Sequence, residues 1–418
     1  RNGIKNWQSW QDGMPIDYDY YKPSLDYIKD SRMETMLTLS GSNVSFDHIP
    51  VTEDELKDFY AFCYRVAADT KDYVNIYEIW NEPNESFFNV NATPEQYAEA
   101  LKTASIAVKA ANPNAKIAGV ALSGTGAAYA ERVLKAANGC IDYVTVHPYM
   151  WMQSPEKGGL VSKVEEIIKV MEKYGLSRDK LWFGEVGFYS HVGYENMAAY
   201  TTQMFLLKDA YDLASKIFIF RYTDAPSLPR EGFGLVNAII DREPFMARKA
   251  FLTMSAYNAL MTDNTPNGII DYDDNQKLYR FKLRDGRDCI VMWNNDEKRE
   301  ISLNLGCDSA VVYDACGNSN TVYGIKQKYQ FSCGGLPIYV TGNFSKVEKC
   351  DNLFDVDKDV LKIVNGDGSE LTVKNLSGMA LNAKFETTAE ILTEKEAEIG
   401  SEPKKIPITA GDISKNAA

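Results

Sequence analysis

The sequence predicts an α/β protein built on a (β/α)8 barrel of the TIM type that lacks its first strand or strands. An antiparallel β-sandwich and a partial second β module are expected to follow it. Two observations support this prediction. Short apolar runs alternate with amphipathic helical stretches from about residue 33 to 262, and the alternation stops after Met261. One strand and one helix in every roughly 25–40 residues is typical of a parallel sheet covered by helices, and a barrel fits best.

The predicted strands of this barrel are nearly continuous apolar runs, as expected for strands that are covered on both faces. They are 33–39, 74–80, 116–122, 141–147, 180–188 and 216–222. Capping-box spacings predict three helix starts, at Thr52 with Glu55, Thr93 with Gln96 and Ser162 with Glu165. Pro94 suits a first helical position.

The first strands of the barrel have no complete counterpart in the chain. If the run 33–39 is strand 3, Arg1 falls near the end of strand 2, and strand 1, helix 1 and most of strand 2 have no candidate. We therefore expect roughly 40–60 further residues before Arg1, or a neighbouring segment that covers the open sheet edge.

After Met261 the pattern changes to short alternating runs separated by Gly, Asn and Asp, which favours antiparallel strands. The predicted domains are a catalytic barrel over 1–262, a β-sandwich accessory domain over 265–345, and a partial Ig-like β module with a polar tail over 346–418.

Composition excludes some classes of partner. The net charge is −13 and the sequence pI about 4.9, which disfavours nucleic acid and anionic membranes. No apolar run approaches the roughly 20 residues of a membrane span. The 25 Tyr and 6 Trp suit sugar binding, since aromatic faces stack on sugar rings. We expect an extracellular or cell-surface protein whose signal peptide has been removed. The sequence indicates no oligomeric state.

The seven cysteines form no CxxC pair or His-flanked cluster, and the chain has only three His. We therefore expect no metal and no organic cofactor. Four of the cysteines fall between residues 289 and 333, where either a disulfide or buried free thiols are compatible with the sequence.

The strongest chemical signal is Tyr-Glu-Ile-Trp-Asn-Glu-Pro-Asn at residues 77–84. A buried strand that runs into Asn81 and Glu82 places them at its C-terminal end, the catalytic rim of a barrel. Pro83 then ends the strand. The alternative is a solvated loop acid after a structural Trp.

A second signal is Glu185 in the apolar run 182–188, between Gly184 and Gly187. An acid at such a position is costly unless it is hydrogen-bonded or functional, and the glycines permit a close approach of ligand or backbone. The alternative is a strand-end carboxylate satisfied by a neighbouring Arg or Tyr. Glu82 and Glu185 lie three βα units apart, on facing sides of one barrel mouth, which is the arrangement that glycoside hydrolysis needs.

These motifs resemble those of the clan A glycoside hydrolases. The resemblance rests on residues 79–84, Val-His-Pro-Tyr at 146–149, and Gly184-Glu185. Residues 222–224, 232–235 and 247–259 look most like family 39, the β-xylosidases, α-iduronidases and relatives that act on exopolysaccharides. The resemblance to these glycoside hydrolases covers about residues 30–345. It implies that Glu82 is the acid/base and Glu185 the nucleophile of a retaining enzyme.

The resemblance also implies substrate-binding roles. Asn81 matches the Asn that bonds the 2-hydroxyl, and Tyr149 matches the Tyr that orients the nucleophile. His147 would line the same subsite, or be a core His bonded to backbone. The remaining predicted substrate-binding residues are Trp182, Arg221 and Tyr222.

Strand 8 departs from the family pattern, because it reads Phe-Arg-Tyr at 220–222 where a Trp platform is common. We expect Tyr222 to take the stacking role. Arg221 either pairs with a sugar carboxylate or tethers Asp224 or another rim acid. Arg1 is a candidate for the family's pocket arginine.

The sequence thus predicts a retaining glycoside hydrolase that cleaves a plant or microbial polysaccharide or oligosaccharide by double displacement. The alternative is a non-catalytic carbohydrate-binding or surface protein on a degenerate glycosidase barrel.

Overall fold

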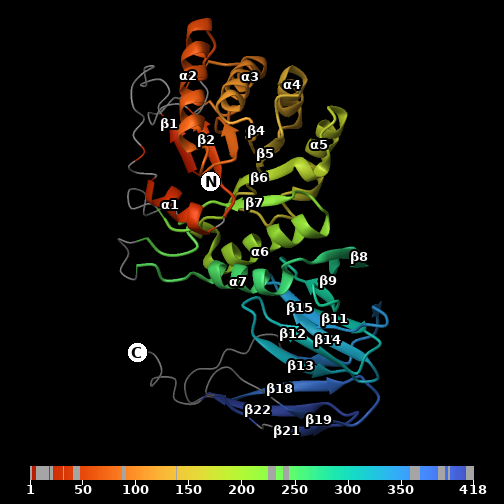
Figure 1. Cartoon of the computed structure of the whole chain (residues 1–418). Coiled ribbons are helices and arrows are strands. Elements are labelled where there is room, and N and C mark those ends of the chain that lie inside the picture. The colour runs from red at the N-terminus through yellow and green to blue at the C-terminus, as the bar shows by residue number, and fades with distance from the viewer. Residues whose placement is uncertain are drawn as a thin grey trace. The chain divides into compact units, whose positions relative to one another are not determined.

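The computed structural model describes residues 2–5, 18, 22–31, 33–40, 48–86, 91–137, 139–224, 232–238, 244–357, 368–384, 391–393 and 396–410. The chain divides into two compact units, Arg1–Phe251 and Leu252–Ala418 (Figure 1). The domain limits at 262 and 346 stay predictions.

The first unit is built on a seven-stranded parallel sheet in which the strands follow one another in chain order. The strands are β1 (Asn2–Lys5), β2 (Met36–Ser40), β3 (Ile76–Ile79), β4 (Lys116–Ser123), β5 (Tyr143–His147), β6 (Leu181–Val186) and β7 (Lys216–Ile219). The six predicted strands are all present, and β1 pairs with β2 where the count from the sequence places strand 2. The predicted partial barrel of the TIM type is confirmed.

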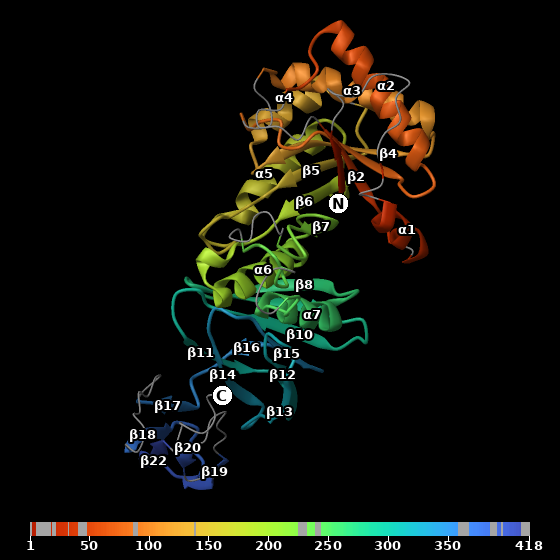
Figure 2. The same ribbon diagram turned by 90° about the vertical axis from the view of Figure 1, so that its left-hand side faces the viewer.

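Helices follow most of these strands, and Figures 1 and 2 show α2 to α5 along the outer face of the sheet. They are α1 (Lys22–Ser31), α2 (Glu53–Thr70), α3 (Pro94–Ala111), α4 (Ala127–Ala137), α5 (Leu160–Lys173), α6 (Tyr194–Ala210) and α7 (Lys249–Met261), with short 3-10 turns η1 (Arg178–Lys180) and η2 (Ser190–Val192). None of the helices in the described ranges is long and apolar enough to cross a membrane.

Two of the three predicted capping boxes are confirmed, at Thr52 and Thr93. The third, at Ser162, is wrong. Helix α5 begins two residues earlier, after Gly159 with φ 71°, so Ser162 already lies in the first turn and its hydroxyl donates to the Gly159 carbonyl.

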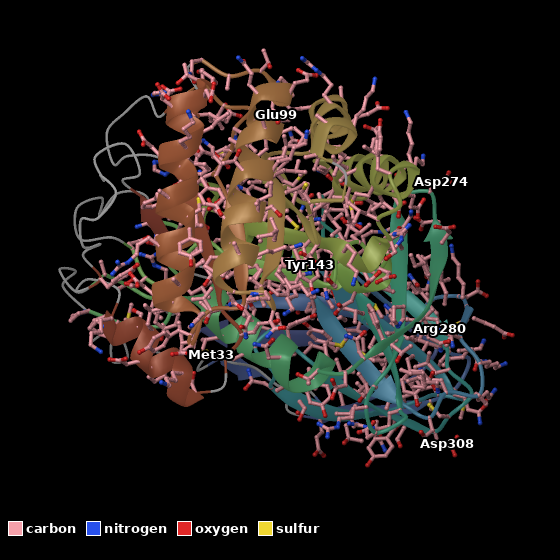
Figure 3. The ribbon with its side chains drawn as sticks, turned by 45° about the horizontal axis from the view of Figure 1, so that its top comes forward. Met33, Glu99, Tyr143, Asp274, Arg280 and Asp308 are labelled. Atoms are coloured by element: carbon pink, nitrogen blue, oxygen red, sulfur yellow. The ribbon has the colours of Figure 1, made fainter. Side chains whose placement is uncertain are left out.

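The barrel interior is layered, because alternate residues of a strand point to the same side of the sheet. The lowest layer holds Met36, Ile76, Ala118 and Trp182, with Tyr143 and Phe218 packed against them. Tyr143, at the start of β5, is labelled in Figure 3, as is the exposed Glu99 on α3. The next inward positions are Thr38, Glu78, Thr145 and Gly184. This second layer is therefore polar.

The second unit consists of antiparallel sheets, as predicted. A six-stranded sheet (order β13-β12-β15-β10-β9-β8) and a three-stranded sheet (order β14-β11-β16) share one apolar core, in a sandwich-like arrangement. Their strands are β8 (Thr265–Asp273), β9 (Gln276–Lys282), β10 (Asp288–Met292), β11 (Arg299–Asn304), β12 (Ser309–Tyr313), β13 (Ser319–Tyr323), β14 (Lys328–Cys333), β15 (Ile338–Gly342) and β16 (Glu348–Lys349).

Two smaller sheets follow, with orders β17-β18-β22-β20 and β19-β21. Their strands are β17 (Phe354–Val356), β18 (Gly368–Asn375), β19 (Leu381–Lys384), β20 (Ile391–Thr393), β21 (Glu396–Ile399) and β22 (Lys404–Ala410). All seven cysteines are free thiols, so the disulfide that the sequence left open between 289 and 333 is not formed.

Candidate active site

Glu82 lies just beyond β3, on backbone that leaves the regular strand conformation. Trp80 has φ 70° and Glu82 φ 49°, both in the left-handed region that non-glycine residues rarely adopt. Hydrogen bonds hold this turn, because Trp80 N donates to the Leu39 carbonyl and Glu82 N to the Ala121 carbonyl, each at 2.8 Å. Strained backbone that its neighbours fix in this way is typical of functional sites.

Asn84 anchors the other side of the same turn. Its Nδ2 donates to the Ser123 carbonyl at 3.0 Å, and Ser123 N donates to its Oδ1 at 2.9 Å. This reciprocal pair ties the turn to the end of β4. Asn84 belongs to the motif at 77–84, but nothing in the sequence indicated this role.

His147, the last residue of β5, contacts Glu82 directly. Its Nδ1 lies 2.8 Å from Glu82 Oε1, and the two side chains are 0% and 14% exposed. His147 is thus a buried core residue, as one alternative had it, but the partner of its Nδ1 is a carboxylate rather than the backbone.

Glu185 occupies the corresponding position at the end of β6. The register with β7 shifts between Phe183 and Val186, and such a bulge re-aims the side chain beside it. The Tyr149 hydroxyl donates to Glu185 Oε1 at 2.7 Å. The carboxylate is half-buried and oriented by a phenol two residues past β5.

The two glycines that flank Glu185 both permit close approaches. A Cβ on Gly184 would stand 3.1 Å from Glu78 Oε1 and 3.2 Å from both His147 Nε2 and Thr145 Cβ. A Cβ on Gly187 would stand 2.2 Å from the Phe220 carbonyl oxygen of the neighbouring strand end. Packing at the site requires Gly187, whereas a Cβ on Gly184 would make three tight contacts that its neighbours would have to relax by a few tenths of an ångström.

The structure brings the two glutamates together. One carboxylate oxygen of Glu82, one carboxylate oxygen of Glu185 and one ring nitrogen of His147 all lie within 4.8 Å of one another. Paired carboxyl groups stand about 5–5.5 Å apart in retaining glycosidases and roughly 6.5–9.5 Å apart in inverting ones. A carboxylate oxygen of Glu82 and one of Glu185 thus approach each other to within 4.8 Å, which is compatible with the shorter of these separations.

The same three side chains are a donor set of the kind that metals use. The hydrogen bonds of His147 to Glu82 and of Tyr149 to Glu185 account for their closeness, and we assign no metal to them.

The remaining predicted residues at the strand ends are placed as follows. Asn81 is half-buried next to Glu82. Tyr222 is 61% exposed, with its ring edge-on to Phe251 at 6.3 Å. The Arg221 guanidinium lies 4.7 Å from the centroid of the Phe220 ring, and the peptide bond between these two residues is cis. Arg1 lies outside the described residues.

The partner of Asp224 is a residue that the sequence analysis missed. Arg248 Nη2 donates to Asp224 Oδ2 at 2.7 Å, while Gly234 N donates to Oδ1 at 2.7 Å. Asp224 is therefore held by Arg248 and not by Arg221, and a sugar carboxylate or another rim acid as the partner of Arg221 stays a prediction. Nothing in the motif marked Arg248, since the ion pair joins residues 24 positions apart through a tertiary contact.

Trp182 is not at the site. It is 2% exposed and belongs to the lowest layer of the barrel, where its ring stacks on Tyr143 at 4.1 Å. The prediction of a substrate contact is wrong because Trp182 stands at the start of β6, whereas Glu185 stands near its end.

Aromatic side chains surround the site and were also missed. Trp151 is 59% exposed and stacks on Tyr149 with ring centroids 5.3 Å apart. Phe233 meets Tyr149 edge-on at 6.2 Å and stacks on Tyr189 at 5.5 Å. The signal available in the sequence was the position of Trp151, two residues after Tyr149.

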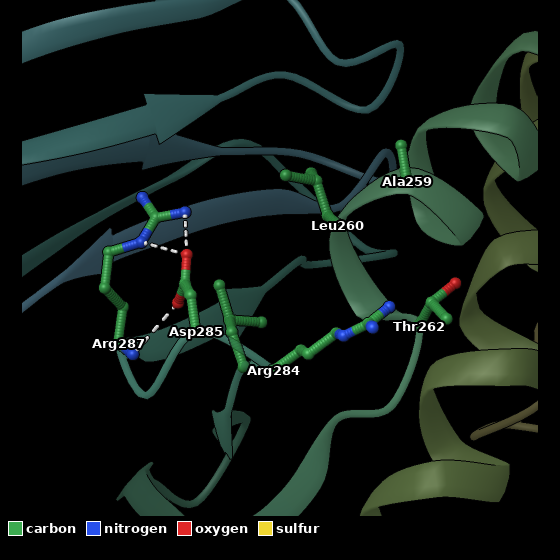
Figure 4. Close-up of a pocket in the computed structure, with 7 residues that line it drawn as sticks. Ala259, Leu260, Thr262, Arg284, Asp285 and Arg287 are labelled. Atoms are coloured by element: carbon green, nitrogen blue, oxygen red, sulfur yellow. Dashed lines mark hydrogen bonds and ion pairs between the residues drawn. The ribbon is translucent and has the colours of Figure 1, made fainter.

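A hollow of about 420 Å³ lies in the second unit, between the end of α7 and the turn after β9 (Figure 4). Its acid, Asp285, is already bound by Arg287 at 2.8 Å. It has no carboxylate pair among its lining residues, so it is not a second site for the same chemistry.

Comparison with known proteins agrees with this geometry. The sequence model of the glycosyl hydrolases family 39 matches residues 56–186, a span that includes Glu82, His147, Tyr149 and Glu185. No curated protein sequence matches the chain.

Solved structures share the fold. A family 39 glycoside hydrolase from the gut symbiont Bacteroides cellulosilyticus WH2 is 21% identical with a TM-score of 0.66, over 81% of this chain and 74% of that one. A family 39 β-xylosidase from Caulobacter crescentus is 18% identical with a TM-score of 0.53, over 80% and 85%. The catalytic domain of the family 30 xylanase C from Talaromyces cellulolyticus is 13% identical with a TM-score of 0.54, over 81% and 86%. The family match over the part of the barrel that carries both glutamates, together with the shared fold, supports a family 39-like glycoside hydrolase.

Proposed function

We propose that this glycoside hydrolase cleaves oligosaccharides or polysaccharides with retention of configuration, with Glu185 as nucleophile and Glu82 as acid/base. In the first step Glu185 forms a bond to the anomeric carbon while the bond to the leaving oxygen breaks and Glu82 gives that oxygen its proton. In the second step Glu82 takes a proton from water, the water oxygen bonds to the anomeric carbon, and Glu185 is released.

The separation of the two carboxylates is the observation that carries this proposal. A carboxylate oxygen of Glu82 lies within 4.8 Å of one of Glu185, which favours the shorter separation of retaining enzymes over the longer one that makes room for the water of an inverting enzyme. A double displacement needs no such water in its first step.

The hydrogen bonds support the assignment of roles. Tyr149 donates to Glu185 Oε1, which suits a carboxylate that must be ionised to attack. Glu82 instead has an imidazole nitrogen as its partner, which can either donate or accept a proton. A group that alternates between acid and base needs a partner of this second kind.

Substrate binding is assigned to the side chains around this pair. To Asn81, the residue before Glu82, we assign a hydrogen bond to the hydroxyl next to the reacting carbon. The exposed rings of Trp151 and Tyr222 offer faces on which sugar rings stack. Arg221 is the cationic residue of this group, and an acidic glycan would use it.

The test compares the parent, Glu185→Ala and Glu82→Ala on aryl glycosides and on polysaccharides. We expect Glu185→Ala to abolish turnover and added azide to restore part of it, with a glycosyl azide of inverted configuration as product. Glu82→Ala should lose least on substrates whose leaving group needs no protonation. Glu99→Ala, at an exposed position on α3, is the matched control and should retain full activity.

Two outcomes would contradict the proposal. A parent that turns over none of these substrates would favour the non-catalytic carbohydrate-binding protein. An azide product from Glu82→Ala rather than from Glu185→Ala, with the same change of configuration, would reverse the two roles.

A further inference from the structure

A third carboxylate lies inside the barrel beneath the catalytic pair. Glu78, on β3, is 0% exposed, and its Oε2 accepts a hydrogen bond from the Thr38 hydroxyl at 2.7 Å. Ordinary barrel layers are filled by branched apolar side chains. An ionised carboxylate in this position costs several kcal/mol unless its surroundings compensate. Its presence calls for a functional explanation.

Glu78 reaches the active site through the ring of His147. Glu78 Oε1 and His147 Nε2 lie 3.1 and 3.2 Å from one common point, the position of a Cβ on Gly184. The other ring nitrogen, Nδ1, lies 2.8 Å from Glu82 Oε1. The imidazole thus stands between a buried acid and the acid/base.

The position of the proton on the His147 ring decides whether Glu82 meets a hydrogen-bond donor or an acceptor. His147 is 0% exposed, and Nε2 is buried with no hydrogen-bond partner among the residues that the structure describes. A neutral imidazole carries its proton on one nitrogen and accepts at the other. A proton on Nδ1 would make the ring a donor to Glu82, whereas a proton on Nε2 makes it an acceptor.

The charged and titratable groups around this ring come from three strands and one helix. Glu78 of β3 and Glu82, just beyond β3, face the His147 ring. Glu185 faces it from the end of β6, and Tyr149 follows His147 two residues later in the chain. Tyr97 of α3 interacts electrostatically with Glu78. Of the acids, Glu78 is the one on the Nε2 side.

We propose that Glu78 is a positioning residue that fixes the tautomer of His147, with the proton on Nε2, so that Nδ1 accepts the proton of Glu82. This inference rests on the proposed role of Glu82 as acid/base. A hydrogen bond from the acid form of Glu82 stabilises that form, which is the one needed to protonate the leaving oxygen. The pairing follows the general rule that a carboxylate at one nitrogen of an imidazole sets the role of the other.

Gly184 is part of the same arrangement. A Cβ there would be in tight contact with both Glu78 and His147, at the 3.1 and 3.2 Å distances given above. The absence of a Cβ keeps the carboxylate and the ring in one shared space.

The direct test is nitrogen NMR on protein labelled with ¹⁵N in histidine. The chain has three His, and the His147 signals are those that disappear in His147→Gln. In the parent we expect Nε2 to show the shift of a protonated nitrogen and Nδ1 that of an unprotonated one. Glu78→Gln should reverse the pattern, because its amide donates a hydrogen bond to Nε2 where the carboxylate can only accept.

Kinetics give a second readout that a merely structural role would not move. In Glu78→Gln, kcat/KM for an alkyl glycoside should fall by about tenfold or more at neutral pH, the equivalent of 1.4 kcal/mol. Its pH optimum should move to lower pH. A dinitrophenyl glycoside, whose leaving group needs no acid, should lose less than about threefold.

A matched control is Glu55→Gln, which removes an acid beside another histidine, since Glu55 Oε1 lies 2.7 Å from His48 Nε2. It should leave the His147 signals and the pH profile unchanged. A proton on Nδ1 in the parent would overturn the proposal, and this reading stands even if Glu78→Gln does not fold. Equal losses on both glycosides in a folded Glu78→Gln would also overturn it. A parent without any glycosidase activity would instead refute the proposed function, and the NMR pattern would still decide the tautomer.

Discussion

Arg248 and Asp224 form a buried ion pair: Arg248 Nη2 lies 2.7 Å from Asp224 Oδ2, and the side chains are 9% and 1% exposed. Arg248 Nη1 also donates to the Gly234 carbonyl at 2.7 Å. The pair therefore fastens the segment that follows β7 to the residue that precedes α7. Phe233, which contacts Tyr149, precedes Gly234 in the chain. The amide of Gly234 is bonded to Asp224 and its carbonyl to Arg248, so the ion pair also holds Phe233 in place.

Breaking this pair should destabilise the first unit. Arg248→Ala leaves Asp224 buried without its cation, and we expect the free energy of unfolding to fall by about 3–5 kcal/mol. Chemical denaturation followed by tryptophan fluorescence measures it. Lys249→Ala removes the exposed pair with Glu195, whose side chains are 35% and 67% exposed, and should cost less than about 1 kcal/mol. Similar losses in the two variants would contradict the structural role given to Arg248.

Tyr149→Phe should impair the chemical step without changing the stack on Trp151. The variant removes the hydroxyl that donates to Glu185 at 2.7 Å and keeps the ring. A hydrogen bond to a charged group contributes about 1.5–3 kcal/mol, so kcat should fall by roughly 10- to 150-fold. Tyr189→Phe, at a ring that stacks on Phe233, is the control and should leave kcat within about twofold. The idea fails if the two variants have the same kcat.

Trp151→Ala should weaken substrate binding more than catalysis. The exposed indole offers a stacking face next to Tyr149, the hydrogen-bond partner of Glu185. Loss of such a stack weakens binding by roughly 0.5–1.5 kcal/mol, which corresponds to a KM increase of about 2- to 12-fold. The increase should appear on oligosaccharides that extend past the reacting sugar. Met152→Ala changes an equally exposed neighbour and should leave KM unaltered. An unchanged KM in Trp151→Ala for every chain length would exclude this platform.

The N-terminus of α2 should make stability depend on pH. Burial acts to raise the pKa of Glu55, but hydrogen bonds from the backbone amides of Thr52 and Val51 and from His48 outweigh it and lower the pKa from 4.5 to about 2. Because the folded pKa is the lower one, this stabilisation is present above pH 4.5 and is lost as pH falls towards 2.

Urea unfolding at pH 7, 5 and 3 measures this effect. We expect Glu55→Gln to be less stable than the parent by about 1 kcal/mol at pH 7 and the difference to shrink at pH 3. Glu53→Gln, in the same first turn but 87% exposed, should show a smaller difference at pH 7. A deficit in Glu55→Gln that is constant with pH would show that the carboxylate charge is not responsible.

The sequence predicted those features that depend on local pattern. Six parallel strands, two capping boxes and the two glutamates at strand ends were all visible, because strand periodicity and the Asn-Glu-Pro turn are properties of a few adjacent residues. The predicted cap at Ser162 was wrong because α5 begins after Gly159, about one helical turn earlier than the spacing of Ser162 and Glu165 indicated.

The errors concern how far along a strand a residue lies and which residue it meets. Trp182 and Glu185 are three positions apart, yet one lies in the lowest layer of the barrel and the other at its rim, and the apolar run around them does not mark this difference. Arg248 was missed because its partner is chosen by the fold. The sequence did not distinguish Glu78 from an exposed acid in a strand, because it does not show whether a carboxylate is buried.

Gly187 has a consequence for β6, the strand that carries Glu185. Its Cα lies so close to the Phe220 carbonyl that an added methyl group would stand 2.2 Å from that oxygen. The ends of β6 and β7 therefore rest on each other main chain to main chain, with no side chain acting as a spacer. This contact sets the spacing of the two strand ends next to Glu185, and an added carbon at residue 187 would force them apart.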